Sequence, residues 1–574
     1  MTRNPDFLQA IVDRAILDEV NLKRLCAKYG SDDFAVLMHL ARSGASKRVN
    51  LGRLWADGLA ISYVDLATTL FQRQIVQLIP EQFAKKHRII PVYQFGEVVT
   101  AATVDPLDRH LVQEAEKVMG RRISPVFAFP DEIEEAIEIE YRSADQLADL
   151  SRKIVVDTIR IEDIGELTRD QLQKAAGSQA VVEFVQGLLL LALKERVSDI
   201  HIEPADENVR IRFRIDGVLQ ERTKLEKALL PPVVSRIKIL SNLDITERRR
   251  PQDGRINLKL PNREIDFRVS CVPSVLGEKI VLRILGQAQA QAAVPDLGEL
   301  HFSKSTMDSV KRIIAIPHGI FFVTGPTGSG KTTTLFSILK HLNKPEINIT
   351  TIEDPVEYRL PGITQVQANP VADLDFAAAL RSFLRQDPDV LLVGEIRDVE
   401  TAQIACQAAL TGHLVLATLH TNNAVQAITR LLDMGVKPFL VAPSLMGVMA
   451  QRLLRKICDQ CKVKYTLSAD EVSNLFALDD STKEITLYKG NGCLQCNYTG
   501  YAGRIAIHEV VVLDDELRGM IARGDSVSDI QRFAKRMGFQ TLRYDGLKKV
   551  LRGLTTMEEV NRVTVPDEVS SQDD

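Results

Sequence analysis

Two hydrophobic patterns alternate in the second half of the chain. Residues 320–324 and 390–393 form short apolar runs, and residues 347–352 are rich in β-branched side chains; all three segments predict buried strands. Residues 376–386 instead place apolar side chains at helical spacing and predict an amphipathic helix. The alternation of predicted strands and helices indicates an α/β domain.

The first 180 residues carry a different pattern. Apolar residues between positions 7 and 20 lie at roughly helical spacing and predict short amphipathic helices. A small α+β domain follows, followed in turn by a charged stretch that we interpret as a linker with helical segments. The strands are expected at 89–93, 97–104 and 123–129, the acidic helix at 131–141, and the linker at 142–178.

Arginine alternates with apolar residues in the next region. After a strongly apolar helix predicted at 181–195, the run 209–217 contains Arg210, Arg212 and Arg214 at every second position. Such alternation predicts a half-buried strand, and the residues alone favour a solvated face for these arginines. We further expect a turn at 251–255, strands at 265–269 and 279–285, and a hinge at 286–298.

A complete phosphate-binding motif follows the strand at 320–324. The motif G-x-x-x-x-G-K-[S/T] lets backbone N–H groups curl around phosphate oxygens, and the helix behind it adds its positive N-terminal end. Its lysine can reach the β/γ-phosphates, and its last hydroxyl can ligate magnesium. We therefore predict a site for ATP and Mg²⁺ formed by Gly325, Pro326, Thr327, Gly328, Ser329, Gly330, Lys331, Thr332 and Thr333, with Thr332 on the metal.

Acidic residues follow two other predicted strands. One strand runs into Glu353 and Glu357, whose carboxylates suit magnesium and water positioning, although such clusters also serve as caps and turns. The predicted strand at 390–393 is followed by Glu395 and Arg397. We expect Arg397 to contact the nucleotide as well. A strand-end carboxylate is the expected partner of a P-loop, so Glu395 is predicted to activate or orient the attacking water.

A third strand, at 414–419, has histidines at both ends. A lone histidine is usually structural. His413 and His420, together with Thr418 and Asn422, favour a sensor of the γ-phosphate, with His420 as the better candidate and His413 as a further nucleotide contact.

Four of the seven cysteines form two C-x-x-C pairs. Cys458 and Cys461 make the first pair, and Cys493 and Cys496 make the second, across a polar insert. Two such hooks suit a tetrahedral zinc site with four thiolates, which is a common structural form. We predict a structural Zn²⁺ that stabilises the insert and takes no part in catalysis.

Composition narrows the class of protein. A length of 574 residues allows about three to four domains. No apolar run approaches the ~18–20 residues of a membrane span, and the start lacks an apolar signal core, so we expect a cytoplasmic protein. A nucleic-acid motor needs a basic channel or stacking aromatics, whereas this chain has one Trp and a formal charge of −4.

Four signatures together identify a family. The segments T-I-E-D-P-V-E-Y, L-R-Q-D-P-D, V-G-E-I-R-D and T-G-H-L-V-L-A-T-L-H-T-N resemble those of the secretion-superfamily motor ATPases, which power type II secretion and type IV pilus assembly. The resemblance covers roughly residues 179–560. It implies a ring-shaped homohexamer that hydrolyses ATP on the cytoplasmic side of the inner membrane and acts on a membrane platform protein.

The resemblance also implies roles for particular arginines. S-D-I-H-I-E-P, R-R-P-Q-D-G-R and D-F-R-V-S look like the family's second N-terminal domain, whose arginines reach nucleotide on the motor domain. Arg268 and Arg283 match best, and Arg255 is a third candidate. Guanidinium groups stabilise charge on γ-phosphoryl oxygens. Arg381 and Arg385, four positions apart on one helix face, would lie at a subunit interface near nucleotide.

The N-terminal region, from about residue 61 to 141, resembles the domain that docks these motors onto membrane-associated partners. Some relatives bind cyclic di-GMP there, but residues 51–54 match that motif only in part, with Asn50 at its arginine position, so a docking domain without a ligand is preferred. The expected order is a docking domain (1–145), a linker (146–178), a small PAS-like α+β domain (179–286), a hinge (287–297), a RecA-like P-loop NTPase domain (298–563) with the zinc insert (458–496), and a disordered tail (564–574).

Two functions from the same family and two from other classes compete. Type IV pilus assembly is the leading hypothesis, and type II secretion shares every motif quoted above. A RecA-like nucleic-acid motor would use the same phosphate chemistry. A nucleotide-gated scaffold without hydrolysis is disfavoured by Lys331 and Glu395. The residues predicted to act in catalysis are Glu395, Lys331, Glu357, His420, Arg268 and Arg283.

Overall fold

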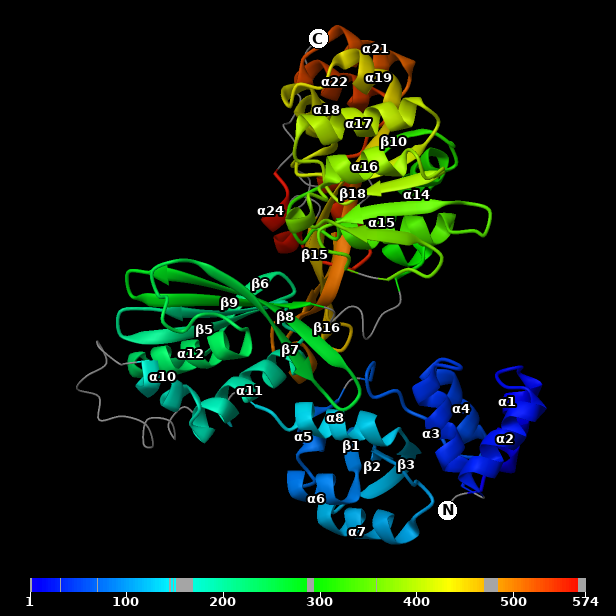
Figure 1. Cartoon of the computed structure of the whole chain (residues 1–574), viewed down its shortest axis with the longest axis vertical. Helices are drawn as coiled ribbons and strands as arrows, with labels where there is room; N and C mark the ends of the chain where they lie inside the picture. Colours follow the sequence, from blue (N-terminus) through cyan, green and yellow to red (C-terminus); the bar gives the residue numbers. More distant parts are fainter. Residues whose placement is uncertain are drawn as a thin grey trace. The chain divides into compact units, whose positions relative to one another are not determined.

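The computed structural model contains two compact units, Met1–Gln291 and Ala292–Asp574. It describes residues 3–30, 32–69, 71–143, 146–147, 149–150, 169–285, 294–357, 359–468 and 484–565. Figure 1 shows the helices and strands of both units, coloured along the sequence. The domain boundaries predicted near residues 145 and 179 both fall inside the first unit.

The first unit opens with a helical cluster. Phe7 and Trp55 are buried in its core, with ring centroids 5.2 Å apart. These helices confirm the predicted amphipathic segment and are α1 (Pro5–Asp13), α2 (Glu19–Tyr29), α3 (Asp33–Ser43) and α4 (Arg48–Gly58).

A small α+β layer follows, as the sequence predicts. Its three strands, β1 (Ile89–Phe95), β2 (Val98–Thr103) and β3 (Arg122–Phe127), form a sheet in that order, antiparallel for the first pair and parallel for the second. The helices of this layer are α5 (Arg73–Val76), α6 (Glu81–His87), α7 (Arg109–Met119) and α8 (Pro130–Glu140).

The remainder of the first unit is a six-stranded antiparallel sheet in the order β6-β5-β4-β9-β8-β7. Alternate strand residues are buried against the apolar helices on one face, and polar residues occupy the other face. The elements are α10 (Arg169–Ala176), α11 (Gln179–Lys194), β4 (Asp199–Pro204), β5 (Asn208–Ile215), β6 (Val218–Glu226), η2 (Lys227–Leu229), α12 (Leu230–Leu240), β7 (Gln252–Lys259), β8 (Glu264–Ser274) and β9 (Gly277–Leu285).

The turn predicted at 251–255 is wrong. Gln252–Lys259 is a strand, and Gly254 lies inside it. A Cβ atom at Gly254 would come within 2.6 Å of the backbone oxygen of Ser241. Glycine is therefore required here because two backbone segments approach closely. This is a different reason for glycine from the turn that the sequence predicted.

The second unit is a three-layer α/β structure around a seven-stranded sheet, in the order β12-β11-β13-β14-β10-β15-β18. Neighbouring strands pair in parallel except for the last pair, in which β15 and β18 are antiparallel. One face packs against α14 and α15, and the other against α16 to α19. Its first elements are η3 (Leu297–Leu300), α14 (Lys304–Ile314), β10 (Gly319–Thr324), α15 (Lys331–Leu342), β11 (Ile349–Glu353), β12 (Thr364–Gln367), η4 (Pro370–Ala372), α16 (Phe376–Phe383), β13 (Val390–Val393), α17 (Val399–Leu410), β14 (Leu414–Leu419), α18 (Ala424–Asp433) and α19 (Pro438–Ser444).

Two long strands leave this sheet and carry the cysteine insert between them. They are β15 (Leu445–Ile457) and β18 (Tyr501–Val512), and the insert holds the hairpin β16 (Lys462–Ser468) and β17 (Glu484–Gly490) with η5 (Leu494–Cys496). The predicted helical end is confirmed as α21 (Asp515–Arg523), α22 (Val527–Arg536), α23 (Leu542–Leu551) and α24 (Met557–Val563).

Parts of three predictions lie outside the described residues: most of the hinge at 287–297, residues 151–168 of the linker, and residues 566–574 of the tail. None of the helices in the described part of the chain is both long and apolar enough to cross a bilayer.

Candidate active site

The P-loop joins the central strand β10 to helix α15. Gly325, Gly328 and Gly330 all have positive φ angles, of 148°, 77° and 88°. A Cβ atom at Gly325 would lie 2.5 Å from the Gln451 carbonyl oxygen, and one at Gly330 would lie 2.7 Å from the Gln451 amide nitrogen. The motif therefore needs glycine for both backbone conformation and space. The loop ends where the 12-residue helix α15 begins, at Lys331, which is an anion-binding arrangement.

The lysine of the motif lies over the loop. Its Nζ atom donates to the carbonyl oxygens of Gly325 and Pro326, at 2.8 and 3.2 Å. Burial lowers the pKa of Lys331, as does the charge of Arg452, while Glu395 raises it. A half-buried ammonium group held at the mouth of a glycine loop is suited to bind a phosphate oxygen.

The two predicted acidic residues after β11 lie in different environments. Glu353 is buried at the strand end, where its Oε1 accepts from Thr351 Oγ1 at 2.6 Å and from Gln365 Nε2 at 3.2 Å. Burial raises the pKa of Glu353. Glu357 is exposed in the loop that follows. Both lie at the carboxyl edge of the sheet, where parallel strands present their ligand-binding groups.

Glu395 and His420 are brought together at the same edge. β13 and β14 are neighbours with Val393 opposite Ala417, so the residues that follow the two strands lie near each other. His420 Nε2 is 3.3 Å from Glu395 Oε2. Arg397 donates to the other carboxylate oxygen of Glu395, and this hydrogen bond raises the pKa of Arg397. The carboxylate thus has an oriented position between a guanidinium and an imidazole.

His413 is not part of this group. It immediately precedes β14, at the amino end of a strand whose carboxyl end leads to His420. Its Nδ1 lies 2.9 Å from the Ala408 carbonyl oxygen and 3.3 Å from Thr411 Oγ1. His413 therefore lies at the opposite edge of the sheet from the P-loop, and the structure of one chain does not bring it to the predicted nucleotide site.

Two residues at this edge were missed by the sequence analysis. Gln451 and Arg452 lie on β15, directly beside the P-loop, since Thr324 pairs with Ala450. Gln451 Nε2 donates to the Ser329 carbonyl oxygen at 2.8 Å, and Arg452 Nη2 donates to Asn422. The sequence does contain a pattern that could have predicted them: two polar residues follow the apolar run 445–450, just as Glu395 follows an apolar run.

The predicted arginines of the first unit lie in one row across three strands. Arg268 on β8 pairs with Arg283 on β9 and with Arg255 on β7. Arg283 Nε also donates to Asp199 Oδ1 at 2.8 Å, and its side chain is 58% exposed. This row lies on the polar face of the sheet and concentrates positive charge there.

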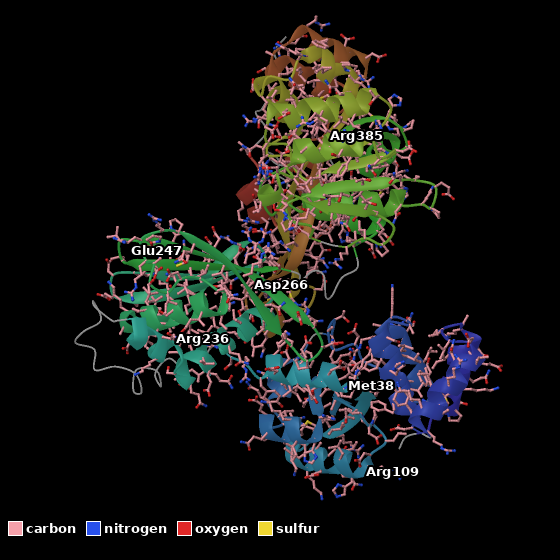
Figure 2. All side chains as sticks on the ribbon, in the orientation of Figure 1. Met38, Arg109, Arg236, Glu247, Asp266 and Arg385 are labelled. Carbon is pink, nitrogen blue, oxygen red and sulfur yellow. The ribbon has the colours of Figure 1, made fainter. Side chains whose placement is uncertain are left out.

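Arg381 and Arg385 lie on the surface of the second unit. Arg381 forms an ion pair with Glu400, 2.5 Å away, and Arg385 Nη1 donates to the Arg381 carbonyl oxygen at 2.8 Å. Arg385, just beyond α16, is labelled in Figure 2. Both side chains are exposed, and their role at a subunit interface stays a prediction.

The four paired cysteines form one cluster, with ligand atoms all within 4.8 Å of one another. The Sγ atoms of Cys458 and Cys493 are 3.8 Å apart, those of Cys461 and Cys496 are 3.8 Å apart, and those of Cys493 and Cys496 are 3.7 Å apart. Tetrahedral zinc with Zn–S bonds of about 2.3 Å places its sulfur atoms about 3.8 Å apart. The cluster has the dimensions of such a site.

Backbone groups support a thiolate in this cluster. The N–H groups of Cys493 and Gly500 donate to Cys496 Sγ, at 3.2 and 3.3 Å. Burial raises the pKa of the Cys496 thiol, but these hydrogen bonds outweigh burial and hold the pKa at about 7. These backbone contacts favour the charged form of the Cys496 sulfur, whereas burial raises the pKa of the Cys458 and Cys461 thiols.

Two family models match the chain. One describes a Type II/IV secretion system protein and matches residues 174–562, and the other describes the MshEN domain and matches residues 59–147. The first covers the six-stranded sheet, the P-loop edge and the cysteine cluster.

Three relatives match along most of their own length. The type IV pilus assembly ATPase PilB of Myxococcus xanthus is 42% identical over 536 residues, which are 92% of this chain and 93% of that protein. Type II secretion system protein E of Dickeya dadantii is 44% identical over 496 residues, 85% and 97% of the two chains. Protein E of Xanthomonas campestris is 39% identical over 572 residues, 97% and 98%. The chain therefore belongs to the type II/IV secretion system protein family and is one of its ATPases.

Proposed function

We propose that this chain is the ATPase that drives type IV pilus assembly, working as a homohexamer on the cytoplasmic side of the inner membrane. The observation that carries the proposal is the P-loop edge, where Lys331, Glu395 and His420 follow the carboxyl ends of three neighbouring parallel strands, β10, β13 and β14. The choice of client rests on the 42% identity to PilB across 92% of this chain.

In the proposed reaction, the loop 325–332 holds the phosphates of ATP, and Lys331 neutralises the β/γ-phosphates. Thr332, with Glu353 and Glu357 in the outer shell, would hold Mg²⁺, whose charge stabilises the transferring phosphoryl group. Glu395 orients the attacking water, and Arg397 and His420 fix that carboxylate in place.

The arginine row would complete the site from the other unit. Arg268 and Arg283 are proposed to contact the γ-phosphate when the unit that carries them closes over bound nucleotide, which also excludes water. Their cross-strand pairing supports the proposal, because it presents two guanidinium groups together to one anion. Arg381 and Arg385 are proposed contacts to a neighbouring subunit.

The cysteine cluster is proposed to hold structural Zn²⁺. Its sulfur spacing of 3.7–3.8 Å supports four thiolate ligands. Cys458 follows β15 directly, and its N–H donates to the carbonyl oxygen of Gly500, the residue just before β18, at 3.0 Å. The metal would therefore hold together the end of β15 and the start of β18.

The N-terminal region is proposed to dock the hexamer onto membrane-associated proteins, and the moving motor to act on an inner-membrane platform protein. Nucleic acid is not among the proposed partners. These proposals rest on family membership and on the MshEN match at residues 59–147.

Type II secretion is the second candidate, because two type II secretion proteins match at 44% and 39% identity. The test is a deletion of this gene in its own host, complemented with wild-type protein or with Lys331→Ala. Loss of surface pili with normal protein secretion, restored only by wild type, is the expected result. Loss of secretion with normal pili would assign the chain to type II secretion instead.

A further inference from the structure

Strand β15 runs past the P-loop and presents two polar residues there. Its pairing with β10 ends at Thr324 opposite Ala450, so Gln451 and Arg452 lie beside the glycine loop. Neither residue belongs to the signatures that identify the family, and neither has a role in the proposed function above.

Gln451 holds the loop from its buried side. It is 2% exposed, donates through Nε2 to the Ser329 carbonyl oxygen at 2.8 Å and accepts from Thr334 Oγ1 at 2.8 Å. Both polar atoms of one buried amide are thus used on the P-loop and on the first turn of α15. Such a paired buried amide fixes a backbone conformation, since removing either partner leaves a polar group unpaired.

Arg452 holds a different loop. Its Nη2 donates to the carbonyl oxygen of Asn422 at 3.0 Å and to Asn422 Oδ1 at 3.1 Å, and its Nη1 donates to the Gln451 carbonyl oxygen at 3.3 Å. The guanidinium therefore bridges the strand beside the P-loop to the loop that follows β14. His420 lies two residues before Asn422 in that loop.

Other hydrogen bonds also hold the loop that carries His420, and Arg452 adds the contact at Asn422. Thr324 Oγ1 donates to the Leu419 carbonyl oxygen at 3.0 Å and lies 2.6 Å from Thr421 Oγ1. Thr421 is tied to Thr324 at the end of β10, with its N–H donating to Thr324 Oγ1 at 3.0 Å. His420 itself is 48% exposed, and its ring has a 3.3 Å contact with Glu395. A half-exposed imidazole keeps this distance only if the backbone on both sides is held.

We propose that Arg452 is a positioning residue for ATP hydrolysis, which acts through Asn422 to hold His420 against Glu395. The neighbouring residue Gln451 holds the P-loop from the same strand. Strand β15 therefore contacts both the glycine loop and the loop that carries His420. This inference rests on the roles of Glu395 and His420 in the proposed function. The forked guanidinium matters here, because one lysine ammonium does not reproduce its geometry.

The test is a double-mutant cycle on the full-length protein, with kcat and KM for Mg²⁺-dependent ATP hydrolysis, and with binding of a fluorescent ATP analogue as a separate readout. Arg452→Gln should lower kcat about tenfold or more, since small misplacements of reacting groups carry such costs. KM and analogue affinity should stay within about threefold. In a His420→Ala background, Arg452→Gln should produce no further loss of kcat.

Two further variants separate positioning from charge and from stability. Arg452→Lys keeps the charge but loses the fork, and should remain impaired. Arg455→Gln changes the same charge three residues along β15, where Arg455 pairs with Glu559 at 2.7 Å, and should lower Tm while kcat stays within about twofold. If Arg452→Gln does not fold, Asn422→Ala tests the same link and should lower kcat only when His420 is present.

Each contrary result has its own meaning. Equal losses with and without His420, or full activity of Arg452→Lys, would overturn the positioning role. A normal kcat for Arg452→Gln alongside an impaired His420→Ala would overturn this inference alone. A normal kcat for His420→Ala would show that the proposed role of His420 is wrong, and the inference would fall with it.

Discussion

Glu559 holds β15 in place between the P-loop and the cysteine cluster. Its buried carboxylate, with 1% side-chain exposure, accepts from the backbone N–H of Arg455 at 2.8 Å, from the Arg455 guanidinium at 2.7 and 2.9 Å, and from Arg562 at 2.8 and 3.0 Å. Burial alone would raise the pKa of Glu559, but the hydrogen bonds from Arg562 and Arg455 outweigh burial and hold the pKa at about 2. We predict that Glu559→Gln destabilises the second unit.

The shift in pKa sets the magnitude. A carboxylate lowered from 4.5 to about 2 contributes about 3 kcal/mol to stability at pH 7. Because the folded-state pKa lies below the unfolded value, this contribution is complete above about pH 5 and is lost as the pH falls towards 2. Near pH 3.5 about 2 kcal/mol should remain. At pH 7 the midpoint for the second unit should fall by about 5 °C in the variant.

Calorimetry of wild-type and variant protein from pH 7 to 3.5 measures this difference. Cysteine protonation in acid affects both proteins alike, so the difference between them isolates Glu559. Glu558→Gln is the matched control, since it removes the same charge from an exposed neighbour on α24 and should change the midpoint by less than about 2 °C. Equal midpoints for Glu559→Gln and wild type at pH 7, or a difference that grows in acid, would show that the ionised Glu559 carboxylate does not stabilise the second unit.

Three other predictions follow from named contacts. Lys331→Ala should abolish binding of a fluorescent ATP analogue, because it removes the ammonium group above the P-loop carbonyl oxygens; binding near wild-type affinity would contradict this role. Cys458→Ser should lower both zinc per chain, by elemental analysis, and Tm; an unchanged metal content would show that the zinc proposal is wrong. Gly254→Ala should destabilise the first unit by about 1–3 kcal/mol, because its Cβ would meet the Ser241 oxygen at 2.6 Å; an unchanged denaturation midpoint would mean that the backbone relaxes freely.

The P-loop edge was predictable because its chemistry is local in sequence. The motif fixes the loop, and an acidic residue or a histidine directly after an apolar strand falls at the carboxyl edge of a parallel sheet. Glu395 and His420 are brought together as this rule implies. The same rule places His413 at the opposite edge, because it precedes its strand.

Other features depend on pairings that one sequence does not display. Gln451 contacts Ser329 from 122 positions away, and only the position of β15 beside β10 brings them together. The row formed by Arg255, Arg268 and Arg283 requires the antiparallel register of three strands. Gly254 resembles a turn residue until the segment that packs against it is known.

In the proposed mechanism, Glu395 directs water onto ATP held by the P-loop of a hexamer. The most direct test measures ATP hydrolysis by purified wild-type and Glu395→Gln protein, with analogue binding and oligomeric mass read in the same samples. We predict magnesium-dependent turnover by a wild-type hexamer, reduced about 100-fold or more in the variant while nucleotide still binds. Rapid hydrolysis by the variant would rule out this role of Glu395, and turnover by a monomer stimulated by DNA would indicate a nucleic-acid motor instead.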